Sequence, residues 1–353
     1  MTAQRTRTTQ RPAAVLAQAP TRVDLAGGTL DIHPLYLLED DAWTVNVAVE
    51  IPVRVRVTRR RVGVVVRSED LNVQVTGEGL DALPTGGRLD LACRALRHAA
   101  GRLGRGGGLE VTLHSAAPPG SGLGASSALL VALLAALDRL GRRPRRPDDL
   151  VAAAWRLEAA SLRTLTGRQD YLAAVCGGVN AIAFGVDGDR IEPLLRRPGQ
   201  RRALEERLVL AYTGQPHASG LTNWGVVRAY LDGSPRAVSG LRRIGVVARQ
   251  VRDALRAGDL DAVGELIGEE WAHRRRLASG VSTPEIEQVL AVARRHGATG
   301  GKACGAGGGG CVLAYTRTGA KPAVERALRA AGVRVLETRV ARRGLHVRTV
   351  RPR

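Results

Sequence analysis

The alternation of hydrophobic and polar positions predicts several strands along the chain. From residue 45 to residue 57 every second position is valine or isoleucine, which is the period of a strand with one buried face. Pro52 lies within this run, and because proline cannot donate to a strand ladder it predicts an edge position or a bend. Shorter runs predict further strands at 62–66, 109–114, 180–184, 208–212, 311–315 and 333–340.

Apolar residues at helical spacing predict helices between these strands. Residues 127–140 are nearly all apolar, which indicates a buried helix, and Gly141 is suited to end it. Asp148 predicts the N-cap of a helix that reaches about residue 165. Thr283-Pro284 predicts the start of another helix. Other helices are predicted over 89–103, 247–255, 260–271 and 321–331.

The order of these elements predicts an α+β protein with two lobes. The length of 353 residues fits two or three domains, and 44% apolar residues can bury a sizeable core. The Arg-rich stretch around 195–202 is the best candidate for a linker. We therefore expect a disordered tail over 1–18, an N-terminal lobe over 19–200 and a C-terminal lobe over 201–353.

Neither the start of the chain nor its apolar runs indicate a membrane protein. The first twelve residues are polar and Arg-rich, without the apolar segment of a secretory signal. No run of about 18 apolar residues occurs, so we expect no membrane span. The four cysteines form neither a C-x-x-C pair nor a dense framework, which predicts a reduced, cytoplasmic setting.

The net charge of +20 has two interpretations. All but two of the 53 basic residues are arginine. Such a charge can form a phosphate-binding or nucleic-acid surface. It can equally reflect codon bias toward Arg, Ala and Gly, and the spread of arginines along the chain favours this second interpretation. Because aromatic residues are only 3% and no zinc-finger or RNP-type pattern occurs, we expect no nucleic-acid partner.

A Gly-rich segment, PPGSGLGASSALL at 118–130, lies between a predicted strand and the buried helix. Glycines permit positive φ angles, so backbone N–H groups can converge on an anion, and the start of the helix adds its own free N–H groups. The segment lacks the GK[ST] ending of a Walker A loop, and it is not a G-x-G-x-x-G of a βαβ unit. We expect phosphate binding here by Pro119, Gly120, Ser121, Gly122, Leu123, Gly124, Ala125, Ser126 and Ser127.

A second Gly-rich segment, GKACGAGGGGC at 301–311, leads directly into a predicted strand. A loop with so few side chains must approach another part of the molecule closely or move. A flexible linker would not be expected immediately before a strand.

Three segments in this order resemble the motifs of the GHMP kinases: APTRVDLAGGTLD at 19–31, PPGSGLGASSA at 118–128 and GKACGAGGGGC at 301–311. GRQDYLAAVCGG at 167–178 and AYTGQPHASG at 211–220 are similar to segments of the sugar-kinase branch, which includes heptose 7-phosphate kinases, fucokinases and galactokinase-like enzymes. The resemblance implies an N-terminal lobe like ribosomal protein S5 domain 2 and a ferredoxin-like C-terminal lobe. It also implies ATP, Mg²⁺ and transfer of the γ-phosphoryl group to a hydroxyl of a sugar or sugar phosphate.

The resemblance assigns catalytic and metal-binding roles to four side chains. Asp170 follows Glu158 by twelve positions, as in the family pattern, and is the expected base, although it could instead cap a helix. Glu158 and Ser126 are the expected Mg²⁺ ligands, with Ser127 as an alternative to Ser126. Arg22 matches the arginine of the first motif and could stabilise the transferring phosphate.

The substrate-binding residues implied by the resemblance are Asp31, His33, Thr213, Gly214, Gly307 and Gly308. Galactokinases have Glu-His before Thr-Asp where this chain has Gly28-Thr29-Leu30, which argues against a plain galactokinase. Weaker candidates for the sugar pocket are Tyr36, Trp43, Asn46, His217 and Ser219. Lys302 matches a motif position but could also be a surface lysine, and Cys304 stands where the third motif usually has Ser or Thr.

Two alternative functions stay open from the sequence. One is a mevalonate-type or other non-sugar kinase, and the other is a nucleotide-binding member of the family without turnover. The oligomeric state also stays open, with a homodimer as one option.

Overall fold

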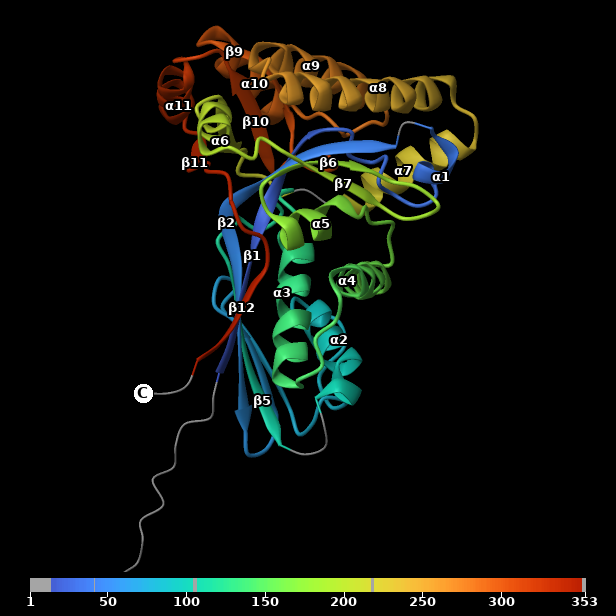
Figure 1. The fold of residues 1–353 in the computed structure, drawn as a ribbon, viewed down its shortest axis with the longest axis vertical. Coiled ribbons are helices and arrows are strands. Elements are labelled where there is room, and N and C mark those ends of the chain that lie inside the picture. Colours follow the sequence, from blue (N-terminus) through green and yellow to red (C-terminus); the bar gives the residue numbers. More distant parts are fainter. Residues whose placement is uncertain (1–13, 41, 104–106, 217–218, 351–353) are drawn as a thin grey trace, which may run out of the picture.

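The computed structural model describes residues 14–40, 42–103, 107–216 and 219–350. Figure 1 shows two lobes, with the long strands and helices α2 to α5 in one and helices α8 to α11 in the other. Among the described residues, no helix is both long and apolar enough to cross a bilayer.

The N-terminal lobe is built on an eight-stranded sheet. Its main path has the order β12-β1-β2-β5-β3-β4, and β6 pairs with both β2 and β7. The strands are β1 (Ala14–Ala26), β2 (Trp43–Arg60), β3 (Val64–Ser68), β4 (Val73–Gly77), β5 (Gly108–Ser115), β6 (Val179–Ala183), β7 (Arg190–Leu194) and β12 (His346–Val350).

Helices cover one face of this sheet, whereas the other face is open (Figure 1). The predicted buried helix is α3 (Ala125–Leu140), which packs on β1 and β2 and is itself covered by its neighbours. Its apolar side chains, such as Leu130 and Leu134, are fully buried, as the all-round apolar pattern predicts. The other elements here are α1 (Leu35–Leu38), α2 (Asp90–His98), a 3₁₀ turn (Ala100–Arg102), α4 (Pro147–Leu162) and α5 (Gln169–Cys176).

Pro52 does lie at an irregular point of β2. Residues 43–47 of β2 pair with β6, whereas residues 53–60 pair with β5. The register with β1 shifts between Ala19 and Thr21 at the same level. Since no partner strand needs an N–H from Pro52 there, the strand continues through the proline and changes partners.

The C-terminal lobe has the predicted ferredoxin-like order. Its sheet, β11-β8-β10-β9, is antiparallel throughout. The strands are β8 (Leu208–Tyr212), β9 (Ala298–Ala303), β10 (Cys311–Thr316) and β11 (Arg334–Leu336). The helices are α6 (Pro198–Glu205), α7 (Ser219–Leu231), α8 (Pro235–Ala257), α9 (Leu260–Arg274), α10 (Pro284–Arg295) and α11 (Lys321–Ala330).

Several local predictions differ from the structure. Asp148 is in the first turn of α4 and not its N-cap, because Pro147 already occupies the first helical position. The strand predicted over 333–340 is only three residues long. The stretch 195–202 contains the start of α6. Residues 14–18, expected in the tail, pair with both β2 and β12, so the last strand returns to the N-terminal sheet.

Candidate active site

The first Gly-rich loop leads into α3 with a backbone that favours glycine. Gly120, Gly122 and Gly124 have φ angles of 63°, 74° and 71°. Gly124 is the N-cap of α3, and no side chain of the described residues caps the helix. The first-turn N–H groups of this sixteen-residue helix are therefore available to an anion.

The second Gly-rich loop lies directly against the first. A Cβ on Gly310 would come within 2.8 Å of the carbonyl oxygens of Gly120 and Ser121, and one on Gly305 within 3.1 Å of the oxygen of Gly122. The backbone N–H of Cys311 donates to the oxygen of Ser121 at 2.8 Å. The lack of side chains in 305–310 thus permits close contact between the lobes, which explains the composition of this loop.

Glu158 of α4 accepts three hydroxyl hydrogen bonds. The Ser127 Oγ donates to it at 2.6 Å, the Tyr171 hydroxyl at 2.5 Å, and the Ser126 Oγ also donates. Burial raises the pKa of the Glu158 carboxyl, and the three hydroxyls partly offset this effect. Ser126 and Glu158, the predicted metal ligands, are therefore in direct contact at the start of α3.

Asp170 and Arg22 form an ion pair beside the Gly-rich loop. The Arg22 Nε donates to Asp170 Oδ1 at 2.7 Å, and its Nη2 lies 2.6 Å from the same oxygen. Arg22 Nη1 donates to the Gly122 carbonyl at 2.5 Å. The other Asp170 oxygen, Oδ2, faces Gly124, where a Cβ would lie 2.9 Å away.

The pKa of Asp170 is raised by burial, although the Arg22 guanidinium opposes the shift. Since Arg22 holds Oδ1, the Oδ2 atom is the oxygen that can accept a proton or a hydrogen bond from a ligand. Asp170 is in the first turn of α5 and does not cap it, because the N-cap residue is Arg168.

Asp31 adds a second buried carboxylate to the site. It is 2% exposed, and its Oδ2 accepts a hydrogen bond from the Gln169 backbone N–H at 3.0 Å. Burial raises the pKa of Asp31 to about 6. Two further buried acceptors nearby, Asp24 Oδ1 and Gln169 Oε1, have no hydrogen-bond partner among the described residues. Such acceptors are suited to ligand hydroxyl groups.

Four charged side chains form a buried network that includes Asp24, a residue of the site. Lys302 Nζ donates to Asp24 Oδ2 at 2.7 Å and to Glu270 Oε1 at 2.9 Å, and Arg274 also donates to Glu270. All four side chains are at most 3% exposed. Lys302 is therefore a core residue, and the alternative of a surface lysine was wrong. Burial by itself would raise the pKa of Asp24, but the Lys302 ammonium holds it below its ordinary value.

Arg274 connects this network to the loop that precedes Asp31. Its guanidinium donates to the Gly28 carbonyl at 2.6 Å and to the Thr29 Oγ1 at 2.9 Å. Thr29 has a φ of 80°, which is rare for a β-branched residue. The C-terminal lobe thus holds a strained loop of the N-terminal lobe in place across some 245 residues of sequence.

One pocket of about 370 Å³ collects most of the predicted site residues. Those that line it are Arg22, Asp31, Pro119–Ser127, Glu158 and Asp170. Five of the predicted substrate-binding residues do not line it. His33 is exposed and hydrogen-bonds to Tyr36, and Gly214 is also exposed. Thr213 bonds to the Gly310 carbonyl, and Gly307 and Gly308 contact residues 280–281. The weaker candidate His217 lies outside the described residues.

The remaining lining residues were not found from the sequence. They include Asp24, Gln169, Asp70, Leu71, Leu162 and Asn223, together with residues 164–167 and 305–306. Asp24 and Gln169 lie within two residues of Arg22 and Asp170, so their motif positions were the available signal. Asp70 and Asn223 come from segments without a motif, and only the fold brings them to the pocket.

Comparisons with known proteins cover both lobes. The model for "GHMP kinases N terminal domain" matches residues 90–178, and the model for "GHMP kinases C terminal" matches residues 251–334. The D-glycero-alpha-D-manno-heptose 7-phosphate kinase of Campylobacter jejuni is 26% identical over 328 residues, which cover 89% of this chain and 93% of that protein.

Two further similarities complete this comparison. The mevalonate kinase of Methanothermobacter thermautotrophicus is 31% identical over 265 residues, 72% of this chain and 80% of that protein. The crystal structure of a D-glycero-D-manno-heptose 1-phosphate kinase from Bacteroides thetaiotaomicron superposes with a TM-score of 0.77, covering 96% of this chain and 100% of that one at 22% identity. That likeness concerns the fold.

Proposed function

Because the chain belongs to the GHMP kinase family, we propose that it transfers the γ-phosphoryl group of ATP to a hydroxyl of a sugar or sugar phosphate. One observation carries this proposal. A single pocket joins a Gly-rich anion cradle at the start of α3 to an aspartate, Asp170, whose Oδ2 faces that cradle. Phosphoryl transfer needs this combination of a phosphate site and a proton acceptor.

The phosphate groups would lie against the loop of residues 119–124 and the first turn of α3. The uncapped N–H groups and the helix dipole favour negative charge there. Among the described residues, Arg22 is the one cationic side chain that lines the pocket, and it is fixed by Asp170 and Gly122. Its role in the proposal is to offset charge on the transferring phosphoryl group.

A divalent cation fits the donor set beside this cradle. Five carboxylates and one arginine line the pocket, so a triphosphate would meet net negative charge. The Ser126 hydroxyl and the Glu158 carboxylate are hard oxygen donors of the kind Mg²⁺ uses, and the described residues hold no cluster of three or more His, Cys, Asp or Glu for a metal held by protein alone. When bound there, Mg²⁺ would neutralise phosphate charge.

Asp170 is the proposed base. Burial keeps its pKa above the ordinary value, which strengthens it as a proton acceptor, and Arg22 orients it through Oδ1. A substrate hydroxyl that donates to Oδ2 would lose its proton as it attacks the γ-phosphorus atom in line with the leaving ADP. By analogy with the sugar-kinase branch, the anomeric hydroxyl is the favoured acceptor.

The pocket chemistry favours a polyhydroxylated substrate. Asp31, Asp24 and Gln169 supply buried acceptors for hydroxyl groups. The heptose 7-phosphate kinase relative matches over 93% of its own length, which agrees with this class. The mevalonate kinase relative is the reason to keep mevalonate as the second candidate. Mevalonate has only two hydroxyl groups, however, which is fewer than a sugar offers to these buried acceptors.

The test is ADP release from Mg²⁺-ATP with a panel of hexoses, deoxyhexoses, heptose 7-phosphate and mevalonate. We expect a signal with one sugar or sugar phosphate. If no ADP is released but ATP still binds in a thermal-shift assay, the substrate is untested or the protein is a member of the family without turnover. If no ADP is released and ATP does not bind, the kinase proposal is refuted.

The variant Asp170→Asn tests the base. It should lower kcat by about 10²- to 10⁴-fold while ATP binding is retained. Asp148→Asn, an exposed residue in the first turn of α4, is the matched control and should keep full activity. A wild-type kcat in Asp170→Asn would refute the assignment.

A further inference from the structure

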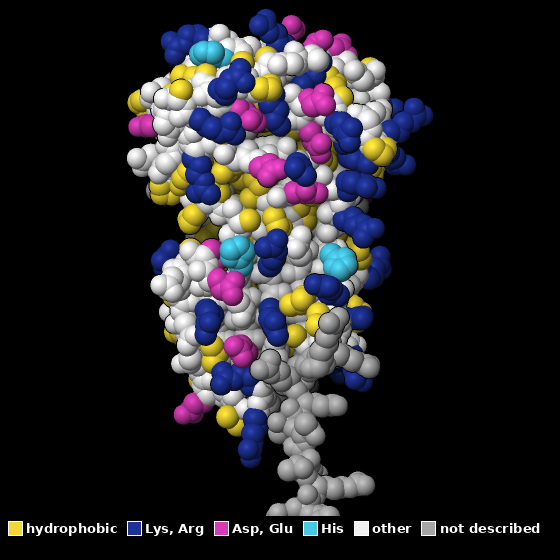
Figure 2. All heavy atoms as spheres, turned by 90° about the vertical axis from the view of Figure 1, so that its left-hand side faces the viewer, with side chains coloured by type: hydrophobic (Ala, Val, Ile, Leu, Met, Phe, Trp, Pro, Cys, Tyr) yellow, Lys and Arg dark blue, Asp and Glu magenta, His cyan; other side chains and the backbone are white. Residues whose placement is uncertain are grey.

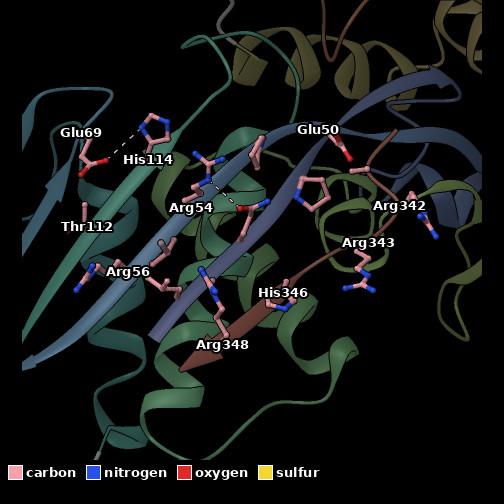
Figure 3. A pocket seen from close by; sticks show the side chains of 18 residues that line it. Glu50, Arg54, Arg56, Glu69, Thr112, His114, Arg342, Arg343, His346 and Arg348 are labelled. Carbon is pink, nitrogen blue, oxygen red and sulfur yellow. Dashed lines mark hydrogen bonds and ion pairs between the residues drawn. The ribbon is translucent and has the colours of Figure 1, made fainter. Parts of the chain in front are cut away.

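A second, larger cavity lies on the open face of the N-terminal sheet. This groove of about 1150 Å³ is formed by β1, β2, β5, β12 and residues 341–344, and it shares no lining residue with the candidate active site. Figure 3 shows its charged side chains along the strands. The Arg groove, as we call it, is lined by Arg54, Arg56, Arg342, Arg343 and Arg348, with His114 and His346.

Strand register places three of these arginines on two strands that flank β1. Gln18 of β1 is opposite Arg54 on one side and His346 on the other, and Leu16 is opposite Arg56 and Arg348. Adjacent strands are about 4.8 Å apart and alternate residues on one strand about 7 Å apart. Arg54, Arg56 and Arg348 therefore lie on one face, within reach of a single ligand that has several anionic groups.

The arginines of the groove lack acidic partners. Arg54 donates only to Gln18 Oε1, at 3.3 Å. Arg56, Arg342, Arg343 and Arg348 make no side-chain hydrogen bond or ion pair with the described residues. Some arginines elsewhere in the described residues do form ion pairs; Asp138, for example, pairs with both Arg102 and Arg145. The two acidic residues of the lining, Glu50 and Glu69, do not pair with any of the five arginines.

The groove is richer in arginine than the chain as a whole. Arginine is 51 of 353 residues in the chain but 5 of the 18 residues that line the groove. Figure 2, which views the open face, shows the dark-blue basic side chains among hydrophobic ones. Unpaired like charges at this spacing repel one another, and a bound anion would relieve that repulsion.

The lining indicates the class of anion. Arginine forms bidentate hydrogen bonds with phosphate groups. The described residues that line the groove include no Phe, Tyr or Trp, the side chains on which the bases of single-stranded nucleic acid stack. Its volume exceeds that of one phosphate group several times over. We propose that the Arg groove binds a small molecule with a chain of two or more phosphate groups, at a site separate from the proposed active site.

The test is isothermal titration of the full-length protein with inorganic tripolyphosphate at about 0.15 M salt, where diffuse charge attraction is screened. The triple variant R54Q/R56Q/R348Q should weaken binding at least about a hundredfold, because each lost arginine–phosphate contact costs about tenfold. All three side chains are exposed, so we expect the variant to fold. Inorganic phosphate should bind at least about tenfold more weakly than tripolyphosphate, since a single phosphate group cannot contact all three arginines.

Two further variants make the result specific. R236Q/R295Q/R326Q removes the same charge from exposed positions on α8, α10 and α11, and should bind as the wild type does. Gly124→Val changes a residue of the proposed active site, which shares no lining residue with the groove, and should keep binding at the groove. Equal weakening in both triple variants, loss of binding in Gly124→Val alone, or absence of binding to the wild type would each overturn the proposal, whatever the kinase assay shows.

Discussion

The two cavities of the molecule carry opposite charge. The candidate active-site pocket is lined by one arginine, Arg22, against five carboxylates, namely Asp24, Asp31, Asp70, Glu158 and Asp170. The Arg groove is lined by five arginines against two glutamates. Both lie in a chain with a net charge of +20, so the total charge does not indicate the sign of the site where chemistry is proposed.

The cavities also differ in how their charges are satisfied. In and under the pocket, charged groups are buried and mostly paired, as with Arg22 and Asp170 or Lys302 and Asp24. In the groove, the five arginines are exposed and form no ion pair with the described residues. The difference predicts that removing one charge is costly at the pocket, where its partner is left buried, and nearly neutral at the groove, where water already solvates the neighbours.

The largest effect is expected for Lys302→Met. The change leaves Asp24 and Glu270 buried without the ammonium group that bonds to both, and breaking a buried ion pair costs about 3–5 kcal/mol of unfolding free energy. Urea denaturation measures this loss. Lys321→Met, at the other lysine of the chain, is the control and should cost less than about 1 kcal/mol, since that residue is half-buried at the surface. An equal loss of unfolding free energy in both variants would show that the buried Lys302 network is no more costly to break than a surface contact.

The next effect is the pH dependence caused by Asp31. Its folded pKa, about 6, lies above the ordinary value of 3.8, so the folded state binds more protons than the unfolded state between these values. The unfolding free energy should therefore fall as the pH rises from about 4 to 6, by up to about 1.36 kcal/mol for each unit between the two pKa values. Asp31→Asn should remove this slope and weaken substrate binding.

Urea titrations of Asp31→Asn and wild type across pH 4–7 test this expectation. Exposed Asp81→Asn serves as the control and should follow the wild-type curve. If the Asp31→Asn curve also runs parallel to that of the wild type, Asp31 does not have the raised pKa that its burial requires.

A moderate effect is expected for Ser126→Ala. Loss of this hydroxyl should raise the Mg²⁺ concentration needed for half-maximal activity about tenfold, because one of the two proposed protein ligands is removed. Ser127→Ala is the comparison, since both hydroxyls donate to Glu158. A larger shift in Ser127→Ala would move the ligand role to the buried serine.

The smallest effect is expected at the groove. Arg54→Gln and Arg348→Gln should each change the unfolding free energy by no more than about 0.5 kcal/mol, because both side chains are exposed and lack acidic partners. Thermal denaturation at low salt measures this change in unfolding free energy. A loss above about 2 kcal/mol in either variant would show that the groove arginines support the fold and are not free for a ligand.

Much of the fold and of the site was predictable from local pattern. The valine alternation of β2, the apolar run of α3 and the cap at Thr283 depend on neighbours in sequence, and each element formed where expected. The Gly-rich loop was recognisable because the anion binding proposed for it needs a particular backbone, and that backbone needs glycine. Arg22, Glu158 and Asp170 were found from motifs, and the structure brings them to one pocket.

Only the tertiary structure decided which residues far apart in the sequence contact one another. Nothing near Lys302 in the sequence indicates that it pairs with Asp24, which is 278 residues away. The return of β12 to β1, which places Arg348 across β1 from Arg54 and Arg56, has the same origin. Periodicity records which face of an element is buried, but not which element covers it. The sign of the net charge that lines each cavity therefore depends on contacts that form only when the chain folds.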